Sequence, residues 1–222
     1  MIKEFIQLIY PEFCAGCGDQ LQFSEKAVCS SCLVELRNYS FTSAKSFFGR
    51  HIAEDEIYLF NNFKNKILQK IVYELKYNRN KSSGYILGME LGYLIKKSIY
   101  DCSYDFIVPV PISKVKRNKR GYNQCELIAE GVSQILKVPI AFNYLNRNNN
   151  LNSQINSNRY QRWLNVEEQY SLIKEFKNYS KLLIVDDIVT TGATINSCIK
   201  AIKKNNSKIT ISVAALAGSK VI

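Results

Sequence analysis

The sequence predicts an α/β fold, in which a parallel sheet is flanked by helices, preceded by a small N-terminal module. Three observations lead to this prediction. Short apolar runs alternate with helix-like segments in the second half of the chain, two closely spaced cysteine pairs stand near the N-terminus, and one apolar run ends in two aspartates and a threonine-rich turn. We therefore divide the 222 residues into an N-terminal module at 1–50 and an α/β domain at 51–222, with a helical part at about 51–104 and a core at about 105–222.

Hydrophobic periodicity defines the elements. Between residues 64 and 77, Ile67, Leu68, Ile71, Val72 and Leu75 recur at the spacing of one helix face. In chain order, we predict a strand at 57–60, helices at 64–77 and 85–98, a strand at 106–110, a helix at 123–136, strands at 140–145 and 182–185, a helix at 194–204 and a strand at 209–216. Ligands of such sheets bind beyond the carboxyl ends of the strands, so we expect the functional site there.

The cysteines of the N-terminal module predict a metal site. Cys14 and Cys17 form one pair, and Cys29 and Cys32 form a second pair after eleven intervening residues. Two such pairs can fold as two tight turns whose thiolates enclose one tetrahedral Zn²⁺, and a closed site of four thiolates is structural rather than catalytic. The alternative is a small cap with four unligated thiols.

Charge is unevenly distributed along the chain. The sequence has 30 Lys and Arg against 19 Asp and Glu, a formal net charge of +11, yet residues 1–50 hold five residues of each sign. The whole excess therefore belongs to residues 51–222. This basic surface predicts a polyanionic ligand, either nucleic acid or a small phosphorylated molecule.

The composition also argues against several classes of protein. His51 is the only histidine, which leaves no catalytic triad of the serine or cysteine type unless this residue is the base. No apolar run approaches the roughly 20 residues that span a bilayer, and the N-terminus lacks the basic start and long apolar centre of a signal peptide. We therefore expect a cytoplasmic protein without a membrane span, whose cysteines are thiols and metal ligands rather than disulfides.

The segment at 182–194 carries the most specific chemistry. A buried strand is followed by Asp186 and Asp187, whose carboxylates are acceptors suited to sugar hydroxyls or to a magnesium shell. A turn then leads into a helix, and its backbone amides and hydroxyls predict an anion seat. The residues of this turn are Thr190, Thr191, Gly192, Ala193 and Thr194.

A basic segment follows another predicted strand and should lie at the same edge of the sheet. The strand ends in a proline-containing stretch, Pro109, Val110, Pro111, Ile112 and Ser113. Five basic residues come next and could neutralise a pyrophosphate, although such runs are more often solvated loops. They are Lys114, Lys116, Arg117, Lys119 and Arg120.

These motifs together carry a family resemblance. Residues 182–194 resemble the phosphoribosyl pyrophosphate signature of type I phosphoribosyltransferases. With the paired cysteines, the Pro-Val-Pro strand, the run from Arg120 to Gln124 and the polar loop at 153–165, the chain resembles the ComF family of competence proteins over nearly its whole length. The resemblance implies a type I phosphoribosyltransferase-like sheet, with a flexible hood loop at 153–165 that closes over the substrate.

The resemblance also implies roles for individual residues. The threonine-rich turn would hold the 5′-phosphate, the two aspartates the ribose 2′- and 3′-hydroxyls, and the stretch from Pro109 to Ser113 the pyrophosphate. The residues implied in catalysis are Asp186, Asp187, Arg120 and Arg159. Further substrate contacts are implied for Lys114, Gln154 and Arg162.

Two functional interpretations stay open. The first is a phosphoribosyltransferase, an enzyme of pentosyl transfer, that binds phosphoribosyl pyrophosphate with Mg²⁺ and acts in natural transformation and DNA uptake on an unknown acceptor. The second is a non-catalytic sensor of the same ligand, or a module that binds single-stranded DNA beside a helicase partner. A patch of lysine, arginine and tyrosine would suit base stacking, although its tyrosines could equally pack inside a lysine-rich helix. The patch comprises Tyr73, Lys76, Tyr77, Arg79 and Lys81.

Overall fold

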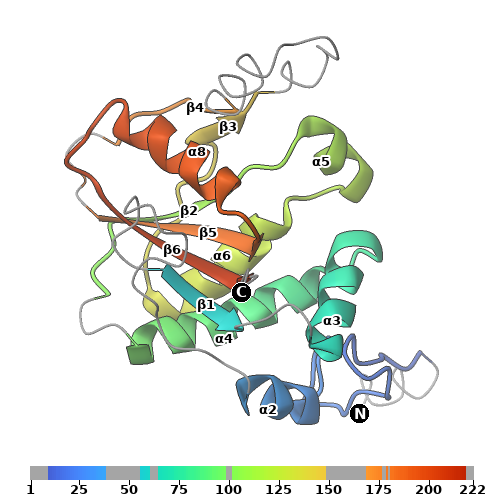
Figure 1. Ribbon diagram of the computed structural model, residues 1–222. Helices are drawn as coiled ribbons and strands as arrows, with labels where there is room; N and C mark the ends of the chain where they lie inside the picture. Colours follow the sequence, from blue (N-terminus) through green and yellow to red (C-terminus); the bar gives the residue numbers. More distant parts are fainter. Residues whose placement is uncertain are drawn as a thin grey trace.

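A four-stranded parallel sheet forms the centre of the molecule (Figure 1). The computed structural model describes residues 10–38, 56–60, 65–98, 102–148, 169–176, 179 and 181–218. The strand order is β1-β6-β5-β2, and every neighbouring pair is parallel. The strands are β1 (Glu56–Phe60), β2 (Phe106–Pro109), β5 (Lys181–Val189) and β6 (Thr210–Gly218).

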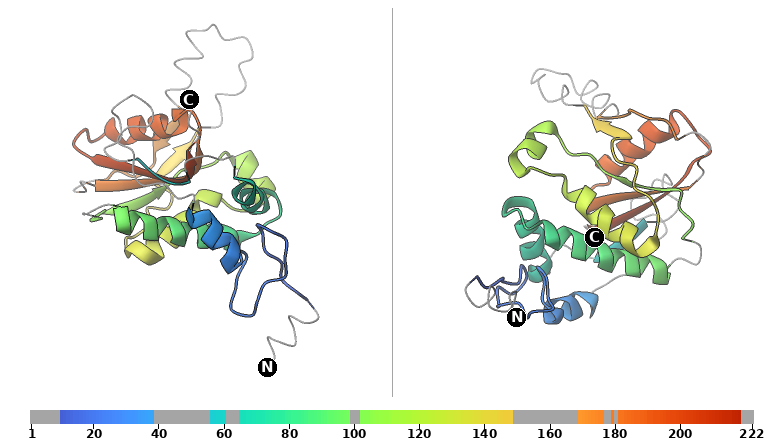
Figure 2. Two further views of the ribbon diagram at one scale, coloured as in Figure 1. Left: turned by 60° about the horizontal axis from the view of Figure 1, so that its bottom comes forward. Right: turned by 180° about the vertical axis from the view of Figure 1, so that it is seen from behind.

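Helices cover both faces of this sheet (Figure 2). On one face lies α8 (Ala193–Lys203), with a two-stranded antiparallel sheet of β3 (Leu145–Arg147) and β4 (Tyr170–Leu172) beside it. On the other face lie α4 (Lys81–Ser98) and α6 (Gln124–Leu136), which pack tightly against each other. The arrangement confirms the predicted α/β fold with a parallel sheet flanked by helices.

Alternation along β5 divides the core between the two faces. Leu182 and Ile184 belong to the hydrophobic cluster that contains the buried residues of α8, and Leu183 and Val185 belong to the cluster that contains those of α3 (Lys66–Tyr77), α4 and most of α6. All four are fully buried. Successive side chains of a strand point to opposite faces, so a strand covered on both sides is apolar throughout.

The N-terminal module packs on α3 and α4 through α2 (Ser30–Asn38) and the cysteine-bearing loops. Arg37 of α2 donates through Nε and Nη2 to the two carboxylate oxygens of Glu90 in α4, at 2.7 Å each. Gly16 lies so close to α3 that an added Cβ would be 2.9 Å from both Ile67 Cγ2 and Cys32 Sγ. Buried residues of the module and of α3 therefore share one hydrophobic cluster.

Several element boundaries differ from the sequence prediction. The second long helix begins at Lys81 instead of residue 85, and the basic run forms a short helix, α5 (Lys114–Arg120), instead of a loop. The predicted strand at 140–145 is wrong: Ile140 makes one isolated bridge to Ile107, and the pairing strand β3 begins only at Leu145. The prediction failed there because an apolar run does not show whether a neighbouring strand lies close enough to form hydrogen bonds with it.

Among the described residues, no helix is both long and apolar enough to cross a bilayer.

Candidate functional site

Two buried carboxylates lie near the carboxyl end of the central strand β5. Asp186 and Asp187 are each 7% exposed, and Asp186 pairs in register with Ala215 of β6. The alternation of the strand continues through them, so Asp187 falls on the side of Leu183 and Val185, the side of α3 and α6. The two adjacent carboxylates consequently meet different surroundings.

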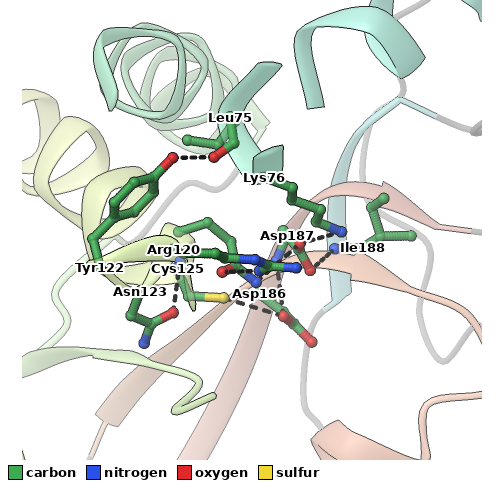
Figure 3. A network of polar contacts seen from close by, with 10 residues as sticks. Leu75, Lys76, Arg120, Tyr122, Asn123, Cys125, Asp186, Asp187 and Ile188 are labelled. Atoms are coloured by element: carbon green, nitrogen blue, oxygen red, sulfur yellow. Dashed lines mark hydrogen bonds and ion pairs between the residues drawn. The ribbon is translucent and has the colours of Figure 1, made fainter. Parts of the chain in front are cut away.

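The carboxylate of Asp187 contacts the ammonium of Lys76 and the backbone N–H of Ile188 (Figure 3), and also the side-chain amide of Gln124. Lys76 Nζ lies 2.5 Å from Asp187 Oδ2, and Gln124 Nε2 donates to the same oxygen at 3.2 Å. Asp187 Oδ1 accepts from the backbone N–H of Ile188 at 2.8 Å. Burial by itself would raise the pKa of Asp187, but the charge and hydrogen bond of Lys76 lower the pKa below its usual value.

Asp186 has no such cation among its contacts in the described part of the chain. Its Oδ1 accepts from the backbone N–H of Asp187 at 2.8 Å and from the thiol of Cys125 at 3.3 Å. Burial and the neighbouring charge of Asp187 raise the pKa of Asp186 to about 7. Burial and the two carboxylates also raise the pKa of Cys125 well above its usual value, so this residue acts as a thiol donor.

The segment from Arg120 to Cys125 joins three elements around these carboxylates. Tyr122 donates its hydroxyl hydrogen to the carbonyl of Leu75 in α3. Asn123 caps α6 by accepting from Cys125 N at 3.0 Å, and its Nδ2 donates at 3.0 Å to the carbonyl of Val110, just after β2. Gln124 and Cys125 then reach Asp187 and Asp186. The sequence resemblance included the run from Arg120 to Gln124 but not Cys125, and only the structure shows what each side chain contacts.

The predicted pyrophosphate stretch comes directly beside the acidic pair. Pro109, the last residue of β2, pairs with Val185, and the N–H of Val110 donates to the carbonyl of Val185 at 2.9 Å. Val110 is buried, and Pro111, Ile112 and Ser113 are half-buried. The hydroxyl of Ser113 accepts from the N–H of Lys116 at 3.3 Å and caps α5.

The basic residues of α5 differ in exposure and in partners: Arg117 donates through Nη1 and Nη2 to the two carboxylate oxygens of Glu126, at 2.8 and 3.2 Å. Lys114, Lys116, Arg117 and Lys119 are exposed. Arg120 is half-buried: its Nη1 donates to Gln124 Oε1 at 2.6 Å, and its guanidinium lies 5.7 Å from the centroid of the Tyr77 ring. Arg120 is therefore linked to Asp187 through the amide of Gln124.

The threonine-rich turn connects β5 to α8. Gly192 stands at the N-cap with φ of 71°, a left-handed conformation that glycine adopts without steric cost. Thr190 and Thr191 are exposed, and Thr191 Oγ1 accepts from the N–H of Ala193 at 3.4 Å; Thr194 is half-buried in the first turn of the helix. The turn thus presents hydroxyls and a helix N-terminus beyond the same strand that carries the carboxylates.

Other predicted residues have different outcomes. Gln154, Arg159 and Arg162 lie outside the residues that the structure describes. Lys76, assigned from the sequence to an exposed patch, instead contacts Asp187. Position 76 is rotated about the helix axis by about 60° from Tyr73 and by about 100° from Tyr77, away from the face that the two tyrosines share. That assignment was wrong for Lys76. No local pattern distinguishes it from the other lysines of α3.

The four paired cysteines form a compact cluster far from the carboxylates in the sequence. Their sulfur atoms all lie within 4.8 Å of one another, with Cys14 Sγ 3.8 Å from Cys32 Sγ and Cys17 Sγ 3.7 Å from Cys29 Sγ. A regular tetrahedron with Zn–S bonds of about 2.3 Å has edges of about 3.8 Å, so these residues fit one Zn²⁺.

Backbone amides favour the thiolate form at one of these cysteines. Cys14 Sγ accepts from the N–H of Gly16 at 3.3 Å and from that of Cys29 at 3.2 Å. Burial by itself would raise the pKa of Cys14, but these amides and that of Cys17 lower it to about 7. A thiolate is the form that binds a metal.

Comparison with known proteins gives matches to a family model and to curated proteins. The family model described as a phosphoribosyl transferase domain matches residues 123–220. Competence protein F of Haemophilus influenzae is 22% identical over 213 residues, covering 86% of this chain and 90% of that protein. Competence protein ComFC of Bacillus subtilis is 27% identical over 119 residues, covering 51% of this chain and 45% of that protein.

Among solved structures, orotate phosphoribosyltransferase from Aeropyrum pernix matches with a TM-score of 0.34 and 11% identity, covering 84% of this chain and 91% of that one.

Proposed function

The chain is a phosphoribosyltransferase-related protein of the ComF family, and from this premise we propose that it binds phosphoribosyl pyrophosphate with Mg²⁺ at the carboxyl end of β5. The observation that carries the proposal is the succession of chemistry along one strand. Two buried carboxylates are followed, after the last two residues of β5, by a threonine-rich turn that opens α8. Acceptors for ribose hydroxyls and an anion seat for a phosphate thus follow each other at one edge of the sheet.

The proposed reaction is transfer of the phosphoribosyl group to an acceptor. The bond between ribose C1′ and the pyrophosphate oxygen breaks, the electron pair leaves with pyrophosphate, and the acceptor's lone pair forms the new bond to C1′. Positive charge develops on the ribose as negative charge develops on pyrophosphate, so the protein has to position both and stabilise the separated charges.

Different residues would position the ribose and stabilise the charge on pyrophosphate. Asp187, an oriented carboxylate, would accept from a ribose hydroxyl, with Asp186 as the second acceptor. The stretch from Pro109 to Ser113, followed by the basic side chains of α5, would face the pyrophosphate. A Mg²⁺ ion bound together with the ligand would supply further positive charge against the leaving group. Arg159, Arg162 and Gln154 of the predicted hood loop are proposed to complete the site.

Titration calorimetry tests the binding step. We expect the wild-type protein to bind phosphoribosyl pyrophosphate in the presence of Mg²⁺ and the double variant Asp186→Asn/Asp187→Asn to bind it at least roughly 100-fold more weakly, since two charged acceptors are replaced together by neutral amides. Circular dichroism of both proteins controls for folding. Equal affinities of the two proteins would refute the site.

Release of pyrophosphate in the same samples separates an enzyme from a sensor. Slow release from bound ligand, with water as the acceptor, would support a transferase that lacks its own acceptor. Tight binding without release, also in the presence of candidate nucleophiles, would support the non-catalytic alternative.

One observation favours a second candidate function, the binding of single-stranded DNA. The rings of Tyr73 and Tyr77 are both more than half exposed and lie 4.9 Å apart, and Arg79 and Lys81 are exposed nearby in the chain. Aromatic side chains beside cations are the chemistry on which unpaired bases stack. The two relatives are named competence proteins, and we extend to this chain a role in natural transformation, in which single strands would be handled together with a helicase.

Binding of an oligothymidylate tests this surface. We expect Tyr73→Ala/Tyr77→Ala to lower its affinity by roughly tenfold or more, since each stacked base contributes about 1–3 kcal/mol. Exposed Tyr93→Ala on α4 serves as the matched control. An affinity unchanged by the tyrosine variants, or by salt, would refute the surface.

A further inference from the structure

Lys76 occupies an unusual place for a lysine near the end of a helix. It is the last residue but one of α3, and its side chain is 19% exposed, whereas the side chain of Asp187, which it contacts, is 9% exposed. The distance from Nζ to Asp187 Oδ2 is 2.5 Å. A pair so largely removed from water differs from the solvated pairs of a surface, because neither partner can be replaced by water at small cost.

The last turn of α3 is fastened where Lys76 can reach β5. Tyr122 donates to the carbonyl of Leu75, the residue directly before Lys76, and the side chain of Leu75 is fully buried (Figure 3). Asn78 ends the helix, with its N–H donating to the carbonyl of Glu74. The position of Lys76 is thus determined by the same segment, Arg120 to Cys125, that brings Gln124 to Asp187.

Three groups restrict how the Asp187 carboxylate can turn. Lys76 and Gln124 both contact Oδ2, and Gln124 is itself held by Arg120, whose Nη1 donates to its Oε1 at 2.6 Å. The N–H of Ile188 holds Oδ1. Lys76 is the only charged member of this set that contacts the carboxylate directly, within the part of the chain that the structure describes.

We propose that Lys76 is a positioning residue of the phosphoribosyl site, which holds the Asp187 carboxylate in the orientation that accepts a ribose hydroxyl. The inference rests on the proposed function and deepens it. It adds to the site a residue from α3, which lies outside both the threonine signature and the segment at 123–220 that matches the family model. Lys76 acts through Asp187 and contributes to the ribose part of the ligand rather than to its phosphates.

The first test compares ligands that carry different parts of phosphoribosyl pyrophosphate. We expect Lys76→Met to weaken binding of phosphoribosyl pyrophosphate and of ribose 5-phosphate by roughly tenfold, to leave binding of Mg²⁺-pyrophosphate unchanged, and Lys76→Arg to recover part of the loss. Lys70→Met, at an exposed position of the same helix, is the matched control and should bind like wild type. A loss confined to pyrophosphate, or no loss at all, would overturn the proposal.

A double-variant cycle tests whether Lys76 works through Asp187. Once Asp187→Asn has removed the carboxylate, adding Lys76→Met should change ribose 5-phosphate affinity by less than about twofold. A full tenfold further loss would mean that Lys76 contacts the ligand itself, against the proposal. The double variant leaves no unpaired charge and serves also where Lys76→Met alone does not fold. If wild-type protein binds none of the three ligands, the proposed function fails, a result distinct from equal binding by wild type and Lys76→Met.

Discussion

Asp186 and Asp187 are neighbours of the same residue type, yet their side chains have different partners. Successive side chains of a strand point to opposite faces, so the two carboxylates lie on opposite faces of β5. Of the two, only Asp187 contacts the ammonium of Lys76. Asp186 has a thiol and a backbone amide as donors, and its pKa rises to about 7. Asp187 is thus held as an anion by a cation. In Asp186 the ionised form is disfavoured, because a buried charge without an opposite charge beside it costs free energy.

The raised pKa of Asp186 predicts a pH dependence of stability in the ligand-free protein. A carboxyl whose pKa is higher in the folded state stabilises the fold at pH values below its unfolded pKa of about 4, and this contribution is lost as pH rises towards 7. We expect the Asp186→Asn protein not to show this loss of stability as the pH rises. Its free energy of unfolding relative to wild type should increase between pH 5 and 7, by at most about 1.4 kcal/mol per pH unit, and level off above pH 7.

Urea unfolding of both proteins across pH 5–8, without ligand or Mg²⁺, measures this difference. Groups that the two proteins share cancel in the comparison. A constant difference across that range would show that Asp186 titrates as an ordinary carboxyl.

At the scale of elements, the close approach of α4 and α6 places the start of α6 beneath the site. An added Cβ at Gly131 would lie 2.2 Å from the carbonyl oxygen of Tyr85, and one at Gly88 would lie 2.2 Å from that of Ile128. Only glycine permits the two backbones to lie so close. Because α6 begins with Asn123, Gln124 and Cys125 at β2 and β5, this packing helps to set the distance from α6 to the carboxylates.

Gly131→Ala should destabilise the protein although alanine favours helices. The helix propensity gain is about 1 kcal/mol, whereas forcing two backbones apart in a packed core costs typically 1–3 kcal/mol and more when backbone has to move. An added Cβ 2.2 Å from a backbone oxygen puts this cost at the upper end of the range, so we expect a net loss of roughly 2 kcal/mol, measured by urea unfolding. Gln134→Ala, at an exposed position of the same helix, is the control and should stay within about 0.5 kcal/mol of wild type. Stabilisation by Gly131→Ala would contradict the tight packing.

At the scale of the whole molecule, the cysteine cluster and the carboxylate site are connected through α3. The module packs near Ile67 at the start of this helix, and Lys76 reaches Asp187 from its end. Cys14, Cys32 and Leu36 of the module lie in the same hydrophobic cluster as Leu68 and Ile71. Loss of order in the module would therefore remove part of the packing of α3.

Removal of a Zn²⁺ ion bound by the four cysteines should consequently lower the thermal stability of the whole chain. We expect an excess of chelator to decrease the unfolding midpoint by several degrees, since each 1 kcal/mol lost lowers the midpoint by about 2–4 °C for a protein of this size. Scanning calorimetry of the protein purified in the presence of Zn²⁺ measures the shift.

Two cysteine variants complete this experiment. Cys17→Ser, which changes the exposed member of the cluster, should start at the lower midpoint and respond little to chelator. Cys102→Ser, outside the cluster, should respond like wild type. A wild-type midpoint that chelator leaves unchanged would argue against a structural metal.

The sequence alone determined those features that depend on neighbouring residues. Periodicity predicted most helices and strands, cysteine spacing predicted the cluster, and the order strand, Asp186, Asp187, threonine-rich turn, helix predicted where the candidate site lies. These patterns are local, and backbone geometry converts them into structure with little information from elsewhere.

Only the tertiary structure decided which distant side chains meet. Lys76 comes to Asp187, Gln124 links Asp187 to Arg120, and Cys125 donates to Asp186 because α3, α6 and β5 pack together. The same packing makes one aspartate the partner of a lysine and leaves the other beside a thiol. These contacts join segments separated by dozens of residues, and their geometry follows from burial of the two hydrophobic faces of the sheet rather than from any pattern along the chain.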